Sequence, residues 1–471
     1  MKSSDRLGLP VVGSEVGSAA LAERPWGWDL LRLSPVRWTI TSPLYPGLFQ
    51  AISIVIFGLI VYFGLFGTMR PAYNFATVVT WTLWWPLVPL SLLLVGRAWC
   101  AICPIPPAIT LTQRIARPTR LPGQLLRRYG VWMMAGIFLF ITWADRVWGI
   151  TDSPGGTAYL LMALTVGAVV MAVLYQRRAF CRYVCPIGAL TGLYAMTSAV
   201  ELRSRERGCK ECQQECFRGA SEAEGCPLYQ YPRTMDSNRN CNLCGLCVKR
   251  CPHGAIELRA RVPGRELWLL KSPLVAEAFL VALLVATVYV QTVDMTTAWG
   301  SYMRWLLDST PIHSYQLGFT LTLLGALALV LVAYLAVTRV SGGLGSWRRN
   351  FAAFGYAYIP LALAVHLGHN AGHLIGEGPS ALRTAIRAVT PPFDTFRPAG
   401  AGGGVQLNQL WLLPIIVIGG MASIYVAWRI SRRSRDLGYA GRFAPHLVFL
   451  VALTALFVQL FLMPMNPRHS H

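Results

Sequence analysis

Charged residues are scarce in this sequence. Asp, Glu, Lys and Arg together make up 13% of the 471 residues, whereas hydrophobic residues make up 54%. A soluble protein carries roughly a quarter charged residues. This balance therefore argues against an ordinary soluble domain and is typical of a membrane protein.

Acidic residues are scarcer than basic ones, with 21 Asp and Glu against 42 Lys and Arg. The arginines occur in short runs beside apolar stretches, where they set the orientation of a membrane protein. A nucleic-acid-binding protein would instead carry a broad basic face on a polar domain. We therefore expect no nucleic-acid partner.

Isolated cysteines are also absent, because each of the twelve cysteines lies in a pair or a quartet. Secreted disulfide scaffolds are small and polar, so that class does not fit. The close spacing is typical of metal ligation, and assembly of thiolate clusters favours the reducing cytoplasmic side. Residues 1–40 lack an apolar h-region, so we expect no signal peptide.

Long apolar stretches are what the sequence does contain. A membrane-spanning helix needs about 20 mainly apolar residues. The sequence therefore predicts an all-α polytopic membrane protein with about nine transmembrane helices in contact with the lipid bilayer. The predicted spans are 48–67, 76–96, 130–150, 156–176, 272–292, 315–338, 351–375, 408–429 and 443–462.

The loops predict the orientation of these spans. Arginine-rich loops follow the second, fourth, sixth and eighth spans, whereas the charges of the alternate loops are more mixed. Basic loops stay in the cytoplasm. We therefore expect a bacterial-type inner membrane location with a cytoplasmic N-terminus and a periplasmic C-terminus. The predicted units are a cytoplasmic segment (1–45), a four-helix membrane domain (46–199), a cytoplasmic ferredoxin-like α+β insert (200–265) and a five-helix membrane domain (266–471).

The insert contains eight cysteines in two runs. The run Cys241-x2-Cys244-x2-Cys247-x3-Cys251, followed by proline, is that of bacterial ferredoxins, in which the fourth cysteine ligates the other cluster. Zinc sites also use short cysteine spacings, but rarely this run. The sequence therefore predicts two [4Fe–4S] clusters with crossed ligands. The predicted sets are Cys209, Cys212, Cys216 and Cys251 for one cluster, and Cys241, Cys244, Cys247 and Cys226 for the other.

Four further cysteines form a duplicated motif at the ends of two spans. Cys100 and Cys103 follow the second span, Cys181 and Cys185 follow the fourth, and each pair precedes a proline. On a helix each pair would share one face. The four sulfurs could meet as a third metal centre or as redox-active dithiols. The alternative is that they are small buried residues.

These elements carry a family resemblance. The Gly96–Pro104 and Cys181–Pro186 motifs, followed by a two-cluster insert, resemble the NapH/NosR/CcoG-type membrane polyferredoxins over about residues 45–260. The resemblance implies a role in anaerobic respiration or metalloprotein maturation. It also implies electron passage between the quinone pool or cytoplasmic donors and periplasmic redox proteins. Residues 266–471 show no such resemblance.

The seventh predicted span carries three histidines. His366, His369 and His373 are spaced i, i+3 and i+7, so they form one stripe on a helix. Placing a polar group inside a membrane costs free energy, and such groups are usually functional. Four interpretations stay open: a ligand of haem b, a copper or other soft-metal site, a quinol site, or hydrogen bonding between helices. Further candidate ligands predicted at the same outer face are His313, Met463, Met465, His469 and His471.

Two neighbouring charged residues, Asp145 and Arg146, lie near the outer end of the third predicted span. They are interpreted as an interfacial ion pair or as part of a proton relay.

The sequence as a whole predicts a membrane-bound iron–sulfur electron-transfer protein. It would relay electrons between a cytoplasmic donor or the quinone pool and a periplasmic or membrane redox partner. Enzymatic activity stays open, for example as the membrane redox subunit of a quinol dehydrogenase or another oxidoreductase complex. The alternatives are a maturation factor that reduces copper or a disulfide, and a redox-driven transporter.

Overall fold

The structure is a computed structural model that describes residues 27–205, 225–342, 346–390, 409–433 and 438–464. Within these residues nine helical segments are long and apolar enough to cross a membrane. This confirms the predicted all-α polytopic fold. The nine segments are Gly47–Phe66, Phe75–Val95, Gln124–Trp148, Pro154–Leu174, Val275–Val293, Tyr315–Val340, Trp347–Val389, Leu410–Ser431 and Ala440–Leu462.

The first half of the membrane domain contains four of these spans. They are α2 (Gly47–Phe66), the composite of α3 (Phe75–Thr77), η5 (Val78–Trp84) and α4 (Trp85–Val95), then α7 (Gln124–Trp148) and α8 (Pro154–Leu174). The middle part of the composite span, η5, is a π-helix. Such segments are rare and frequently occur at functional sites.

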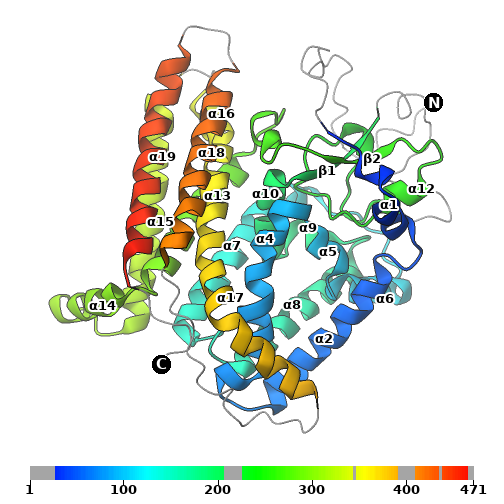
Figure 1. Cartoon of the computed structure of the whole chain (residues 1–471), viewed down its shortest axis with the longest axis horizontal. Coiled ribbons are helices and arrows are strands. Elements are labelled where there is room, and N and C mark those ends of the chain that lie inside the picture. The colour runs from blue at the N-terminus through cyan, green and yellow to red at the C-terminus, as the bar shows by residue number, and fades with distance from the viewer. Residues whose placement is uncertain (1–26, 206–224, 343–345, 391–408, 434–437, 465–471) are drawn as a thin grey trace.

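The second half contains the other five spans. They are α13 (Val275–Val293), α15 (Tyr315–Val340), α16 (Trp347–Gly355) continued by α17 (Ile359–Val389), α18 (Leu413–Ser431) and α19 (Tyr439–Leu462). Helix α17 packs on α18 as well as on η5 and α4, so it joins the two halves (Figure 1). Gly419 permits the close approach of α18, because a Cβ atom there would lie 2.2 Å from Cβ of Ala364.

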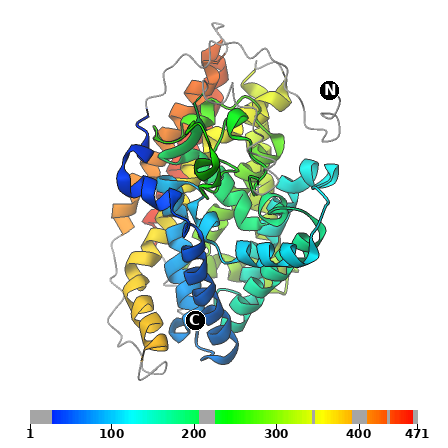
Figure 2. The same cartoon turned by 90° about the vertical axis from the view of Figure 1, so that its right-hand side faces the viewer.

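A small module lies at one end of the helical bundle. It contains β1 (Val200–Ser204), β2 (Ile256–Ala260) and α12 (Leu246–Arg250), with α1 (Ser34–Thr41) beside them (Figures 1 and 2). The two strands are antiparallel. The amide of Ala260 donates to the carbonyl of Trp28 at 2.9 Å, so the first described residues belong to this end. We call it the iron–sulfur end, from the cysteines that it carries.

The last described residues lie at the opposite end. The amide of Thr297, which follows α13, donates to the carbonyl of Pro464 at 3.0 Å. Helix α14 (Thr297–Ser309) lies at the same end in Figure 1. The described chain thus starts at the iron–sulfur end and finishes at the other, as an odd number of spans requires.

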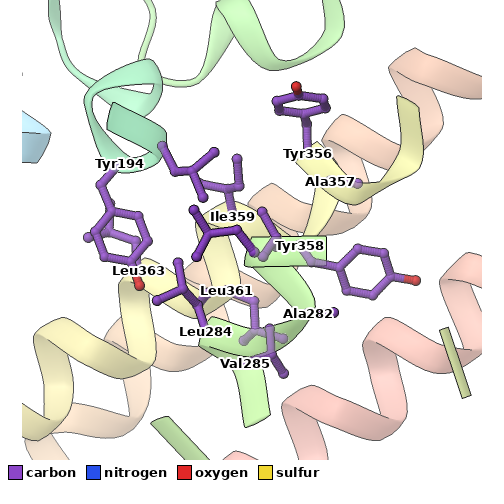
Figure 3. Packing of buried hydrophobic residues seen from close by; sticks show 14 of the residues in the cluster. Tyr194, Ala282, Leu284, Val285, Tyr356, Ala357, Tyr358, Ile359, Leu361 and Leu363 are labelled. Atoms are coloured by element: carbon purple, nitrogen blue, oxygen red, sulfur yellow. The ribbon is translucent and has the colours of Figure 1, made fainter. Parts of the chain in front are cut away.

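The core lies between α7, α10 (Pro186–Tyr194), α13, α17, α18 and α19. Figure 3 shows Tyr194 pointing toward Leu363 of α17, while Leu284 and Val285 of α13 lie against the same helix. Tyr194 and Tyr356 are fully buried. The half with the duplicated motif and the half without a recognised family therefore share one hydrophobic core.

Two features differ from the sequence prediction. Helix α14 was not expected, because it is amphipathic and too short to span a bilayer. The seventh span covers 347–389 rather than 351–375. Its helix continues through Pro379 and reaches well past the three histidines.

Candidate functional site

The duplicated cysteine pairs each lie where one short helix ends and the next begins. Helix α5 (Ala98–Ile102) contains Cys100 and ends at Cys103, and α9 (Ala179–Tyr183) contains Cys181. Cys185 is the N-cap residue of α10. Each pair therefore spans the end of a short helix. The physical reason is the proline after each pair, which favours the first turn of a new helix.

The four thiols of the two pairs nevertheless gather in one place. Burial raises the pKa of Cys181 to about 11 and that of Cys185 to about 12, and in each case the neighbouring thiols add to the effect. Burial also raises the pKa of Cys103 well above its usual value, and Cys100, Cys181 and Cys185 contribute to this increase. Four thiolates in one place would repel one another unless a cationic centre held them together. The donor set therefore fits a metal cluster.

Arginine side chains surround this membrane cysteine group. Arg97 is only 2% exposed, and its positive charge opposes the increase in pKa at Cys181 and Cys185. Gly188 of α10 makes room for it, because a Cβ atom there would lie 3.4 Å from a guanidinium nitrogen of Arg97 and 2.9 Å from the carbonyl of Cys181. The cysteine group and its counter-charge are thus packed as one unit.

A second group of four cysteines lies in the module. Burial raises the pKa of Cys241 to about 12, with added repulsion from Cys244 and Cys226. Burial also raises the pKa of Cys247 well above its usual value, with contributions from the other three thiols. These four residues are the predicted second ligand set, and the structure brings them together.

The other predicted ligand set is described only in part. The Sγ atom of Cys251 accepts a hydrogen bond from the amide of Ala255 at 3.2 Å. Cys209, Cys212 and Cys216 lie outside the described residues. The crossed assignment, in which Cys251 and Cys226 exchange clusters, stays a prediction.

Two arginines connect the module to the membrane cysteine group. The amide of Arg178 donates to the carbonyl of Pro227 at 3.1 Å, and the Arg177 guanidinium donates to the carbonyl of Cys226 at 3.3 Å. The charge of Arg178 acts on Cys181 and also on Cys244. The two cysteine groups are therefore neighbours, which is the arrangement that electron transfer between clusters requires.

In the described part of the chain, no three His, Cys, Asp or Glu side chains converge closely enough to hold one metal ion.

A cavity of about 160 Å³ lies in the membrane domain beside the membrane cysteine group. Pro186 and Ile187, which directly follow Cys185, form part of its wall. Much of the rest is apolar, from η5, α4, α7 and α8. These apolar lining residues are Trp81, Trp84, Trp85, Phe138, Ile141, Leu160, Leu161 and Leu164.

Polar atoms without partners face this cavity. Thr80 and Asn370 line it and are 3% and 1% exposed. Within the described residues, neither Oγ1 of Thr80 nor Oδ1 of Asn370 has a hydrogen-bond partner. Buried polar atoms are normally hydrogen-bonded, and exceptions point to an unseen partner. A ligand with polar groups on an otherwise apolar body would satisfy both.

The histidine stripe starts at this cavity. His366 and His369 line it, and His366 lies between the rings of Trp85 and Tyr194, each with a ring-centroid distance of 5.9 Å. His373 lies one turn further along α17, with its Nδ1 atom 3.0 Å from Oε1 of Glu377. The predicted stripe therefore exists, but only its first two members reach the cavity.

The described residues offer no second haem ligand at this cavity. Its only lining histidines, His366 and His369, both come from α17. His446 stacks on Phe354 with a ring-centroid distance of 4.0 Å and lies against Tyr358, away from the stripe. Haem b and copper stay predictions that no described pair of facing histidines supports.

An ion pair lies at one end of the cavity. Nε of Arg146 in α7 lies 2.7 Å from Oδ2 of Asp294, which follows α13. Asp145 instead accepts a hydrogen bond from the amide of Thr151 at 2.8 Å. The partner of Arg146 is therefore Asp294 on the other half of the protein. Sequence could not identify this pair, because it depends on the packing of α7 against α13.

Family comparisons agree with this geometry. A model described as "4Fe-4S binding domain" matches residues 77–121 and 157–208, which include all four membrane cysteines. A second model with the same description matches residues 237–257, which include Cys241, Cys244, Cys247 and Cys251. The chain is a ferredoxin-type 4Fe–4S membrane protein.

Relatives of this 4Fe–4S membrane protein match it only in part. YccM of Escherichia coli, provisionally named an electron transport protein, is 34% identical over 97 residues, which are 21% of this chain and 25% of YccM. The methylamine utilization ferredoxin-type protein MauN of Methylorubrum extorquens is 30% identical over 152 residues, which are 29% of this chain and 51% of MauN. An uncharacterized protein of Methanocaldococcus jannaschii is 30% identical over 115 residues, 24% of this chain and 41% of that protein. No solved structure matches the chain significantly.

Some residues beside the cysteine groups or the cavity of the 4Fe–4S membrane protein were not identified from sequence. Arg97 and Arg178 could have been, because each is the first residue of one copy of the duplicated motif. Thr80 and Asn370 carry no such signal. They are single polar residues in apolar helices, and only the packing shows that they face a cavity.

Proposed function

We propose that this protein transfers electrons between a quinone in the cavity and a redox partner at its iron–sulfur end. The observation that carries the proposal is the wall shared by the cavity and the membrane cysteine group, at Pro186 and Ile187. A quinone has a flat polar head and an apolar tail, which suits tryptophan walls beside unpartnered hydrogen-bonding atoms. The quinol interpretation of His366 and His369 is therefore the one we favour.

The cysteines are proposed to hold the electron carriers. Cys100, Cys103, Cys181 and Cys185 would hold one 4Fe–4S cluster, and Cys226, Cys241, Cys244 and Cys247 would hold another. When bound, such clusters supply one-electron transfer. Cys251, with Cys209, Cys212 and Cys216, would hold a third. We thus propose three clusters. The match of a 4Fe–4S domain model over the membrane cysteines supports the third, which the sequence had left open.

The protein's own residues would bind the quinone, supply positive charge near the cysteines and keep water out of the cavity. The cavity walls would exclude water from the quinone head, while Thr80 and Asn370 would orient it by hydrogen bonds. Arg97 and Arg178 would stabilise the extra negative charge near the cysteine groups. Because both described cysteine groups lie at or near the iron–sulfur end, we place the second redox partner there. A periplasmic partner stays a prediction, and so does the inner-membrane location.

Cluster absorbance provides the direct test. The full chain, purified with its clusters, is reduced with dithionite, freed of excess reductant and mixed anaerobically with a short-chain benzoquinone or naphthoquinone. We expect the visible cluster absorbance to recover as quinol forms, with two electrons per quinone. Reduced protein that keeps its bleached spectrum with both quinones present would refute the proposal. Cytochrome c, a protein too large for the cavity, serves as a control for oxidation at the surface.

A further inference from the structure

The histidine stripe continues beyond the cavity in the direction away from the clusters. Helix α17 begins near the iron–sulfur end, because Tyr356 just before it donates a hydrogen bond to Glu277, the ion-pair partner of Arg239 in the module. Its other half runs toward Met295, whose Sδ atom lies 3.3 Å from Nε2 of His373. Met295 is two residues from Thr297, which contacts Pro464 at the opposite end.

Titratable side chains form a continuous row along this part of α17. His369 lines the cavity, and its ring centroid lies 5.3 Å from that of His373. His373 pairs with Glu377 at 3.0 Å. Exposure increases along the row, from 4% for His366 to 12% and 24% for the side chains of His373 and Glu377. The row thus leads from a buried cavity toward the surface of the protein.

The other charged groups around the cavity are held differently. Asp294 is paired with Arg146, and Asp145 and Asp152 also lie within electrostatic range of the Arg146 guanidinium. These acids gather around one cation that lines the cavity. His369, His373 and Glu377 instead follow one another along α17.

We infer that His369, His373 and Glu377 carry the protons of the quinone reaction between the cavity and the protein face opposite the iron–sulfur end. The inference rests on the proposed function. Oxidation of a quinol breaks two O–H bonds and yields the quinone, two protons and two electrons. The electrons leave singly toward the iron–sulfur domains, and the protons leave along the row to the opposite face. Quinone reduction reverses every step.

This arrangement separates charge across the membrane. Electrons and protons reach the cavity from opposite faces, whichever way the reaction runs. Each turnover therefore contributes to the membrane potential or consumes it. A proton path to the iron–sulfur end would make the same reaction electrically silent.

Proteoliposomes test from which side of the membrane the quinone reaction takes its protons. The full chain with its clusters is reconstituted so that an N-terminal affinity tag, and hence the iron–sulfur end, faces outward. The clusters are reduced with dithionite from outside, and the excess reductant is removed before a short-chain quinone is added. Valinomycin and potassium collapse the potential, and pyranine inside reports pH. We expect the lumen to lose about two protons per quinone reduced, by the balance above. Vesicles without protein give the blank rate.

Substitutions in the row test whether the protons pass along it. Glu377→Gln and His373→Gln are expected to slow lumenal proton loss and quinone reduction at least tenfold. The matched control is Asp308→Asn, which changes an exposed acid of α14 at the same end and should leave both rates unchanged. Quinone reduction with protons taken from the outer medium would overturn this inference alone. Absence of quinone reduction in the wild type would overturn the proposed function itself.

Cysteine labelling gives a readout that needs no turnover. In Glu377→Cys, a membrane-impermeant maleimide should modify the new thiol only from the compartment opposite the tag, as it should in Asp308→Cys. Mass spectrometry identifies the modified peptide among the native cysteines. Modification of Glu377→Cys from the tag side would contradict the direction that we assign to the row.

Discussion

The Arg97 guanidinium donates a hydrogen bond to the backbone carbonyl of Arg239. Arg97 precedes the first pair of membrane cysteines, whereas Arg239 precedes the cysteine run of the module by two residues. One buried side chain therefore fixes the position of one cysteine group relative to the other. Rates of electron transfer depend on such distances, so in the proposed function this contact would set the transfer rate as well as support the fold.

Removing a shared positive charge should lower the reduction potentials at both cysteine groups. Arg178 acts electrostatically on Cys181 and on Cys244. Reduction adds negative charge, which Arg178 stabilises. In Arg178→Gln we expect both midpoint potentials to fall by on the order of 60 mV, a tenfold change for a one-electron couple. Redox titration followed by EPR measures the change.

The control for this charge effect is Arg348→Gln, because Arg348 is an exposed residue at the start of α16. It should leave both potentials unchanged. If Arg178→Gln lowers the midpoint potential of only one EPR signal and leaves the other unchanged, the two cysteine groups are not electrostatic neighbours.

Removing the membrane cysteines should remove one cluster. Cys100→Ala/Cys181→Ala takes one thiolate from each copy of the motif, and the remaining two cannot hold a four-iron cluster. We expect the iron content to fall by about four atoms per chain. The ferredoxin-type EPR signals of the module should persist. Equal iron in the variant and the wild type would show that the four cysteines hold no iron centre.

The sequence predicted the nine spans and the module because both depend on local patterns. Hydrophobic length alone marks a span, and the run from Cys241 to Cys251 follows from the way in which a short loop wraps a cluster. The grouping of Cys100 with Cys181 was also accessible, because the duplicated motif implies symmetric packing.

The ion pairs and the cavity could not be predicted, because they join residues distant in sequence. Arg146 has an acidic neighbour in sequence, Asp145, yet it pairs with Asp294, 148 residues later. The role of His366 likewise depends on its contact with Tyr194, which comes from the other half of the chain. Amphipathic α14 was missed because its length falls below that of a span.

Breaking the contact between module and membrane domain should destabilise the protein. Glu277 of α13 pairs with Arg239 at 2.8 Å and accepts a hydrogen bond from Tyr356. Burial opposes the charge of Arg239, yet Glu277 raises the pKa of Arg239 overall. Removing one partner of a buried pair costs about 3–5 kcal/mol. We therefore expect Glu277→Gln to lower the thermal unfolding temperature in detergent.

The double variant Arg239→Gln/Glu277→Gln is the informative control for that loss. It removes both charges, so no unpaired charge stays buried, and it should recover part of the stability lost in Glu277→Gln. The single variant Arg239→Gln completes the comparison. If the stability lost in the double variant equals the sum of the losses in the two single variants, the pair contributes no coupling energy.

A single hydroxyl in the cavity should contribute measurably to quinone binding. Oγ1 of Thr80 is buried, faces the cavity and lacks a partner in the described part of the chain. A hydrogen bond to a quinone oxygen contributes about 1 kcal/mol, so Thr80→Val should weaken binding about fivefold while keeping the side-chain shape. Tryptophan fluorescence quenching by a short-chain quinone measures the affinity, because three tryptophans line the cavity. The matched variant Thr322→Val removes a hydroxyl of α15 that bonds Tyr302 away from the cavity, and it should bind the quinone as the wild type does. Equal affinities in all three proteins would mean that the quinone does not occupy this cavity in contact with Thr80.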